Sequence, residues 1–285
     1  MPDPKQFMGD AGFVRSRFKA DPTAAFTAEL RGEVVGSNFA TKWGTVGFFG
    51  PLTVRPDLWD KGVGQKLLDP VMERFLSWEC THRGLFTFAH SPKHIALYQR
   101  YDFWPRYLTA IMGRPIKEGR APGDGRWKFS AVSPGEREPL YKECGEVTDA
   151  IYAGLDASVE VRAIAEQNLG DTVLLWEGSK LAAFAACHMG PNTEAGTGNC
   201  LIKFGAVRPG PNAIENLGRL LDACEALGAA AGCKVLVAGG NMGRLTQYRT
   251  MLSVGFRNDL VGVAMEHKGQ PGYNRPDALV IDDWR

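Results

Sequence analysis

The chain has 285 residues, 44% apolar and 23% charged, a composition typical of a globular protein with one large or two medium domains. Its formal net charge of +1 offers no bulk attraction to nucleic acid or to an anionic membrane. No apolar run approaches the roughly 18 residues of a membrane span, and the first ten residues lack the apolar centre of a signal peptide. We therefore expect a cytoplasmic protein.

Hydrophobic patterning in the first 112 residues predicts a short helix, two strands, a central strand, a strongly periodic helix, and then strand, helix and strand. The predicted elements are helix 10–19, strands 24–30, 34–42 and 45–54, helix 64–78, strand 85–89, a short helix after Ser91, and strand 106–112. Gly50-Pro51 interrupts the central strand and predicts a bulge, so the strand splays where it ends.

Residues 113–126 hold four glycines and two prolines among charges, which is typical of an exposed linker. Beyond them the order of elements repeats, with an opening strand and helices for which residues 1–20 leave too little room. The predicted elements are strand 127–132, helices 134–152 and 158–167, strands 172–176, 181–188 and 199–207, helix 213–227, strand 234–238, helix 244–252 and strand 260–265. A β-prone stretch at 278–281 is suited to pairing with a sheet edge.

Six cysteines are scattered through the chain without a Cys-x-x-Cys pair, inside predicted strands and helices. We expect reduced, buried thiols and no metal site, because no cluster has the spacing of metal ligands. The six are Cys80, Cys144, Cys187, Cys200, Cys224 and Cys233.

The turn between the central strand and the periodic helix contains Gly62 and Gly64. The first N–H groups of a helix have no intrahelical partner, the helix dipole adds partial positive charge, and glycines let a phosphate approach closely. The turn therefore predicts an anion site. Leu67 stands where a dinucleotide loop has its third glycine, and no Gly-Lys-Ser/Thr of a triphosphate loop is present.

This turn resembles the acyl-CoA pyrophosphate loop of the GCN5-related N-acetyltransferase (GNAT) family, written Arg/Gln-x-x-Gly-x-Gly/Ala. Gly62 and Gly64 match, and Trp59 stands at the Arg or Gln position. In the family the loop holds the pyrophosphate mainly through backbone amides, so the side chain at Trp59 is negotiable.

The segment from Ser91 to Phe103 resembles a second GNAT motif, a short helix in which a tyrosine faces the sulfur of coenzyme A. Tyr98 follows Ser91 by seven residues and Phe103 follows Tyr98 by five, the intervals of the family. Ser91 replaces the family's Asn and Asp102 its Gly. Two motifs at the right separation are far more specific than either alone.

The second half repeats parts of this pattern. Ala206-Val207-Arg208-Pro209 echoes Thr53-Val54-Arg55-Pro56, and Asn241 precedes Tyr248 by the interval from Ser91 to Tyr98. No Gly-x-Gly opens the helix after Arg208, and Glu215 would oppose an anion there.

The resemblance implies an α/β (α+β) protein of two tandem GNAT-like acyl-CoA N-acyltransferase domains, each a mixed, centrally splayed sheet flanked by helices. We predict an N-terminal GNAT domain over 1–112, shortened at its start, a linker over 113–126, and a C-terminal GNAT-like domain with a degenerate phosphate loop over 127–285.

The function implied is direct transfer of an acetyl group from acetyl-CoA to a primary amine in a ternary complex. Tyr98 is expected to protonate or hydrogen-bond the departing thiolate, and His90 is the candidate base. A backbone N–H near the bulge would hold the developing oxyanion. The expected cofactor-binding residues are Leu52, Thr53, Val54, Trp59, Asp60, Lys61, Gly62, Val63, Gly64, Gln65 and Ser91.

Plainer interpretations stand beside these. His90 at a strand end also suits a structural hydrogen bond, and the possible acceptor-pocket aromatics Trp43, Phe48, Phe49 and Trp104 also suit a core. A catalytically silent acyl-CoA-binding or regulatory protein, and a nucleotide-dependent oxidoreductase, stay open as alternatives. The expected partner is a small-molecule or peptide amine, with no nucleic acid, membrane or metal, and the chain is expected to be a monomer or homodimer.

Overall fold

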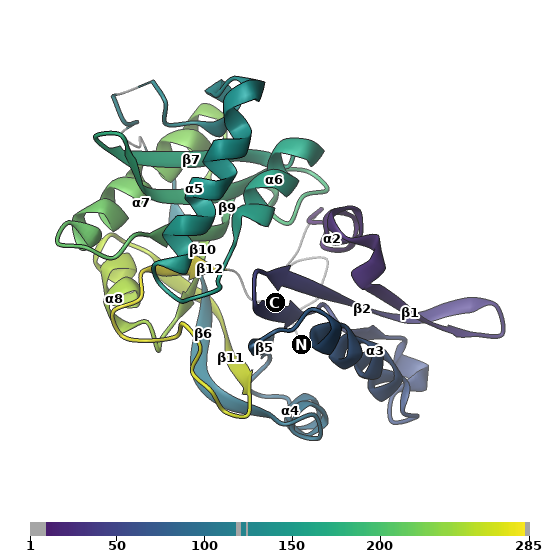
Figure 1. Cartoon of the computed structure of the whole chain (residues 1–285). Coiled ribbons are helices and arrows are strands. Elements are labelled where there is room, and N and C mark those ends of the chain that lie inside the picture. The colour runs from purple at the N-terminus through teal and green to yellow at the C-terminus, as the bar shows by residue number, and fades with distance from the viewer. Residues whose placement is uncertain (1–9, 118–120, 124, 283–285) are drawn as a thin grey trace.

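The computed structural model of this chain describes residues 10–117, 121–123 and 125–282. Its strands form one mixed sheet in the order β1-β2-β3-β5-β11-β6-β10-β9-β8-β7, with β4 paired to β2 and β12 paired to β9 (Figure 1). The helices are α2 (Val14–Ala20), α3 (Val63–Ser77), α4 (Pro92–Gln99), α5 (Arg137–Asp149), α6 (Ser158–Gln167), α7 (Ala213–Ala230) and α8 (Leu245–Ser253). The strands are β1 (Ala25–Leu30), β2 (Glu33–Trp43), β3 (Val46–Phe49), β4 (Thr53–Val54), β5 (His82–Thr87), β6 (Phe103–Pro115), β7 (Gly170–Glu177), β8 (Lys180–Gly190), β9 (Gly196–Val207), β10 (Val235–Asn241), β11 (Arg257–His267) and β12 (Val280–Asp282).

The predicted order of elements is confirmed except at the start of the second half. Residues 129–131 form a short 3-10 helix instead of the predicted strand 127–132. The Phe129 ring packs on Tyr141 of α5, with centroids 5.1 Å apart. The N–H and hydroxyl of Ser130 bind the Asp171 carboxylate at 3.0 and 2.5 Å. The N–H of Ser130 is therefore bonded to a side chain and is not free to pair with a neighbouring strand.

The last strands of the two halves are exchanged. β11, near the end of the chain, lies between β5 and β6, and β6 lies between β11 and β10. The two predicted sheets are therefore one continuous sheet, because β5 pairs antiparallel with β11 and β10 pairs antiparallel with β6. Arg114 of β6 pairs with Leu236, so the strand includes the first residues of the predicted linker. The division of the chain into two domains stays a prediction.

Helices of the second half also cover the first. Trp43 and Val46 belong to the apolar core that α5 and α6 form on one face of the sheet. The indole of Trp43 donates to Glu160 of α6 at 2.8 Å, and the N–H of Thr45 donates to the carbonyl of Gly154 at 2.7 Å. These contacts take the place of the opening helices that the first half lacks.

The other face of the sheet carries two further cores. One joins α3 and α4 to β3, β5 and β11, with Phe49, Phe75 and Tyr98 among its buried members. The other joins α7 and α8 to the strands of the second half. All six cysteines are free and buried, as predicted.

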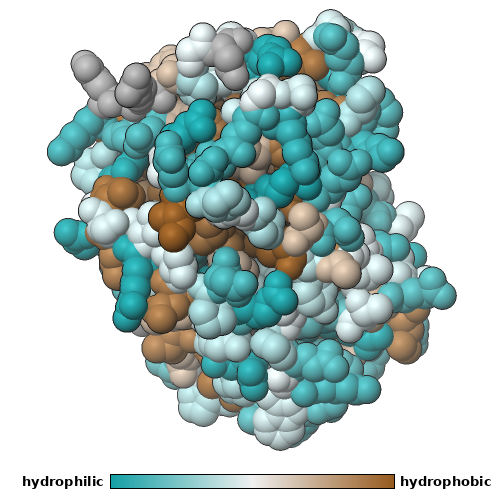
Figure 2. All heavy atoms as spheres, turned by 60° about the vertical axis from the view of Figure 1, so that its left-hand side comes forward, coloured by the Kyte–Doolittle hydropathy of each residue, from teal (hydrophilic) through white to brown (hydrophobic). Residues whose placement is uncertain are grey.

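The surface is of mixed character. Figure 2 shows hydrophilic residues over most of one face, with apolar residues gathered in patches between them. Within the described ranges, no helix is both long and apolar enough to cross a membrane.

The strand exchange predicts that the first half does not fold alone. A fragment of residues 1–117 would leave the edge of β5 without β11 and β6 without either neighbour, so we expect no cooperative thermal unfolding by circular dichroism. Co-expression with residues 118–285 should restore the unfolding transition of the whole chain. A fragment 1–117 that unfolds cooperatively by itself would contradict this account.

Candidate functional site

The site begins at a bulge in the central strand. Phe49 of β3 pairs with Ala40 of β2, and Thr53 of β4 pairs with Ser37, so four steps along one strand match three along its neighbour. The extra residue bends the chain while it stays paired with β2. On its other side, β3 pairs in parallel with β5 only as far as Phe48 and Gly84. The two strands then diverge, which confirms the predicted splay.

The divergence leaves one side of β4 open. Arg55 donates its N–H to the carbonyl of Val35 at 2.8 Å, toward β2. Because successive N–H groups of a strand point to opposite sides, the N–H of Val54 points away from β2. In the part of the chain that the structure describes, no strand pairs with β4 on that side. An extended ligand therefore has room to lie along β4 as an added strand.

The open side leads to the start of α3. Gly62 is the residue before the helix, with φ of +79°, and its carbonyl accepts the N–H of Lys66 at 3.2 Å. The N–H groups of Val63, Gly64 and Gln65 precede that bond and have no acceptor within the helix. A Cβ at Gly62 would meet only the end of the Gln65 side chain, at 3.8 Å. The backbone is thus bare on this side and suits an anion.

A second helix start lies beside the first. A Cβ at Gly64 would contact Leu97 of α4 at 3.3 Å, so the first turn of α3 packs against α4. Ser91 precedes α4, and Lys93 in its first turn reaches Asp60 at 2.6 Å and the Trp59 ring at 5.3 Å. Lys93 is a cation at this loop that was not among the predicted site residues, although it follows the predicted Ser91 by two positions.

The Trp59 side chain binds the strand β4 rather than the glycine loop. Its indole Nε1 donates to the carbonyl of Val54 at 2.9 Å, and half of its side chain is exposed. In a strand the carbonyl and the N–H of one residue point to the same side, so the indole lies on the open side of β4. Lys61 and Asp60 complete the exposed turn between this indole and Gly62.

Tyr98 lies at the end of the divergence. It is buried on α4, and its ring meets Phe49 edge-on with centroids 5.7 Å apart. Burial raises the pKa of Tyr98 to about 12, while a hydrogen bond with the Thr87 side chain acts in the opposite direction. The phenol therefore keeps its proton at neutral pH and is placed to donate it at the end of β5.

The other predicted residues are separated by the structure. His90 is exposed in the turn after β5, with its ring 5.6 Å from that of Phe88. Phe49 faces Tyr98, whereas Trp43 and Phe48 pack on the opposite face with the core of α5 and α6. Trp104 is 46% exposed, and its indole donates to Asp102 at 2.7 Å.

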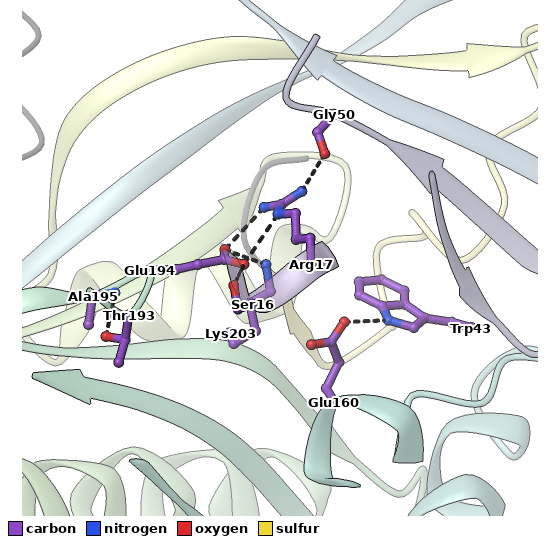
Figure 3. Close-up of polar contacts among 9 residues, drawn as sticks. All are labelled: Ser16, Arg17, Trp43, Gly50, Glu160, Thr193, Glu194, Ala195 and Lys203. Carbon is purple, nitrogen blue, oxygen red and sulfur yellow. Dashed lines mark hydrogen bonds and ion pairs between the residues drawn. The ribbon is translucent and has the colours of Figure 1, made fainter. Parts of the chain in front are cut away.

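A buried ion network holds the bulge in place from the second half. Arg17 of α2 donates to the carbonyl of Gly50 at 2.7 Å and to both oxygens of Glu194 at 3.0 and 3.2 Å (Figure 3). Glu194 lies between β8 and β9 and also binds Lys203 at 2.5 Å. Removing one partner of such a buried network typically costs about 3–5 kcal/mol, so these contacts fix the bend firmly.

The second half has the same divergence, but it is filled. β10 pairs in parallel with β9 only as far as Ala238 and Ile202. From there β12 pairs antiparallel with β9, through residues 204–206, and contacts β10. The predicted β-prone tail thus pairs inside the sheet rather than at its edge. Arg244 secures it by binding the carbonyl of Val280 at 2.7 Å and the carboxylate of Asp282.

The start of α7 is also covered. Asn212 and Asn216 both donate to one oxygen of Glu177, at 3.1 and 3.0 Å, and these bonds lower the pKa of that carboxyl. Glu215 adds a second negative charge in the first turn. A carboxylate of the chain itself therefore sits where the corresponding helix of the first half is bare.

The comparisons with known proteins agree with this geometry. The model of the Acetyltransferase (GNAT) family matches residues 2–103. The first part of the chain is therefore similar to this family. No curated protein matches the sequence.

Solved structures extend the GNAT fold over nearly the whole chain. A putative acetyltransferase from Pyrococcus horikoshii has a TM-score of 0.63 at 13% identity, over 94% of this chain and 82% of that one. A GCN5-related N-acetyltransferase from Sphaerobacter thermophilus has a TM-score of 0.55 at 14% identity, over 85% and 79%. A tandem GNAT protein from the clavulanic acid biosynthesis pathway has a TM-score of 0.54 at 14% identity, over 90% and 87%.

The bare helix start gives a direct test. Replacing Gly62 by Asp would place a carboxylate among the free N–H groups, so we expect coenzyme A affinity to fall at least about tenfold, or 1.4 kcal/mol. Isothermal titration calorimetry measures the change.

Gly32→Asp is the matched control. Gly32 also has a positive φ, of +82°, and open space around it, but it lies in the hairpin turn between β1 and β2. Equal loss of affinity in both variants, or in neither, would count against the proposed anion site.

Proposed function

We propose that this protein is an N-acetyltransferase that moves an acetyl group from acetyl-CoA to a primary amine by direct transfer in a ternary complex. The proposal is carried by two sets of backbone N–H groups for which the described residues offer no acceptor: the N–H of Val54 on the open side of β4, and the N–H groups at the start of α3. Tyr98 lies on the neighbouring helix α4, against Phe49 of the same central strand. The GNAT fold of the chain supports the same assignment.

In the proposed complex the donor lies along the open side of the bulged strand. Leu52 and Val54 are proposed to offer backbone groups to the pantetheine arm, and the N–H of Val54 points to the side where the thioester would lie. Thr53, the third predicted residue, instead pairs with Ser37 of β2. The pyrophosphate binds the N–H groups from Gly62 to Gln65, with Lys93 and Lys61 nearby as cations. Ser91 begins the second helix at the same place.

Acetyl transfer requires groups that stabilise the negative charge on the carbonyl oxygen and groups that accept and donate protons. As the amine attacks, the carbonyl oxygen becomes negative, and a preorganised N–H at the bulge stabilises it. Tyr98 then donates a hydrogen bond to the departing thiolate, because burial keeps its hydroxyl protonated. His90 stays a prediction as the base; its exposed turn lies on the same strand end.

Only the first half is proposed to bind the donor. In the second half β12 takes the strand position that is open beside β4, and Glu177 covers the start of α7. The second half instead completes the first, through β11, α5 and α6 and through the ion network on Gly50. We therefore expect a stoichiometry of one coenzyme A per chain in calorimetric titration, and a value of two would overturn this assignment.

Tyr98→Phe separates an enzyme from a silent binding protein. Losing a positioned acid typically costs at least about 100-fold, so we expect kcat to fall by that order while the Kd for coenzyme A stays unchanged. Release of free coenzyme A in a screen of amines measures kcat.

Tyr141→Phe serves as control, since Tyr141 is buried to the same 7% exposure in the second half. A wild type that binds coenzyme A but acetylates no amine would favour the silent binding protein.

A further inference from the structure

A small cavity lies in the middle of the sheet, on the face opposite Tyr98. It has a volume of about 30 Å³, enough for one or two water-sized groups. Its lining comes from both halves of the chain, from β3, β5, β6, β10, β11, β12 and the loop before β12. The residues on which the argument depends are Phe48, Phe86, Thr109, Glu266 and Asn274.

The cavity adjoins the point where β3 and β5 separate. Neighbouring side chains of a strand point to opposite faces, so Phe49 meets Tyr98 while Phe48 lines the cavity. The same alternation holds in β5: the Thr87 side chain forms a hydrogen bond with Tyr98 on one face, and Phe86 lines the cavity on the other. The cavity and the Tyr98 phenol therefore lie on opposite faces of the sheet, both next to the point where β3 and β5 separate.

Glu266 reaches this place from β11. A Cβ built on Gly84, the last β5 residue paired with β3, would lie 2.6 Å from Glu266 Oε2 and 2.7 Å from the Phe48 ring. The carboxylate therefore rests on the backbone at the point of divergence. Its Oε1 accepts a hydrogen bond from Asn274 at 2.8 Å, and its Oε2 lies 3.0 Å from His82 Nε2 in a geometry that forms no hydrogen bond.

The cavity lining, as far as the structure describes it, holds three buried acceptor atoms without a donor and one buried donor, Arg244 Nε, without an acceptor. Thr109 Oγ1, Asn274 Oδ1 and Glu266 Oε2 are buried and accept no hydrogen bond from the described residues. Thr109 and Asn274 are each 4% exposed. Leaving such groups unpaired is costly, so they point to a ligand that donates several hydrogen bonds at once.

The charges favour a cation. Arg244 and Asp282 pair with each other, and Asp282 also accepts the hydroxyl of Tyr273 at 2.7 Å. Among the residues that the structure describes, His82 is the only group of potentially positive charge within 4 Å of the Glu266 carboxylate. A primary ammonium group has three N–H donors, one positive charge and the size of a water molecule.

We propose that this cavity receives the ammonium group of the acceptor and that Glu266, in place of the predicted His90, removes its proton. The inference rests on the proposed acetyltransferase function and names its acceptor class: a primary amine whose nitrogen is carried on an unbranched carbon. Thr109 and Asn274 orient the nitrogen. Substituted nitrogens match the site less well, because each added carbon removes one of the N–H donors that the three acceptors take up.

The chemistry balances with the groups present. Glu266 takes one proton from the ammonium, and the freed nitrogen attacks the acetyl carbon of the thioester. The new C–N bond forms as the C–S bond breaks, and the sulfur leaves with the bonding pair. The second nitrogen proton ends on the sulfur, giving the acetamide and free coenzyme A. The proton on Glu266 returns to solvent, so one proton is released in each turnover.

The surroundings of Glu266 raise its pKa, which makes the carboxylate a stronger base than an exposed glutamate. Burial raises the pKa of Glu266 and the nearby Asp282 adds to this, while His82 and Arg244 oppose it. Tyr273 and Asn274 face the group from the loop before β12. Since the carboxylate is the active form, turnover should fall as pH drops through this raised pKa, above the ordinary range of a glutamate.

Binding is tested without the donor. Thermal unfolding of the wild type should shift upward with n-butylamine, less with N-methylbutylamine, which has one N–H donor fewer, and not with n-butanol, which lacks the charge. Glu266→Gln should abolish the shift. A wild type that responds to none of the three, or equally to all, would show a cavity that holds water only and would overturn the proposal.

Turnover is tested with a matched pair of threonines. Thr109 and Thr172 are both buried with an unpaired hydroxyl, but only Thr109 lines the cavity. We expect Thr109→Val to raise the KM of the amine about tenfold with the Kd of coenzyme A unchanged, and Thr172→Val to change neither. Glu266→Gln should lower kcat about 100-fold and remove the acidic limb of the pH profile.

The outcomes separate the two proposals. An active wild type with unaffected Glu266→Gln and Thr109→Val variants would overturn the acceptor site and leave the acetyltransferase function standing. A wild type that binds n-butylamine but never releases coenzyme A would support the amine site and overturn the transfer reaction.

Discussion

One extra residue between Phe49 and Thr53 shapes the whole site. It lets the central strand stay paired with β2 while it turns away from β5, and so leaves backbone groups that neither neighbour satisfies. Such groups are costly when buried and become useful when a ligand pairs with them. The bend does not stand alone: Arg17, held by Glu194, binds the carbonyl of Gly50 within the bulge (Figure 3). The geometry of the first half therefore depends on a carboxylate supplied by the second.

The two halves share a fold and differ in what fills the divergence of their strands. In the first half the side of β4 is open and the start of α3 is bare. In the second, β12 occupies the strand position and Glu177 occupies the start of α7. In both places, atoms of the chain itself form the hydrogen bonds that a ligand could otherwise form. These contacts stabilise the fold and fill the position of a ligand. The second copy keeps a structural task, because β11 lies within the sheet of the first and carries Glu266 to its face.

Local features were predictable from the sequence and distant pairings were not. The glycine turn, the interrupted central strand and the helix of Tyr98 each arise from short stretches whose spacing carries the information. The exchange of β6 and β11 depends on contacts between residues 140 or more apart, such as Arg114 with the carbonyl of Val254. In the sequence, Glu266 is a polar residue directly after the predicted strand 260–265. Only the order of strands in the sheet places it beside Gly84. The strand at 127–132 failed because Asp171 captures the backbone of Ser130.

The proposed donor site consists of the unpaired amides of Val54 and of the start of α3. Hydrogen exchange measured by mass spectrometry, with and without acetyl-CoA, tests it most directly. The account predicts that the donor slows exchange of the amides at Val54 and from Gly62 to Gln65. It also predicts no change at residues 207–217 of the second half. Protection confined to that second region, or no protection anywhere, would contradict the account.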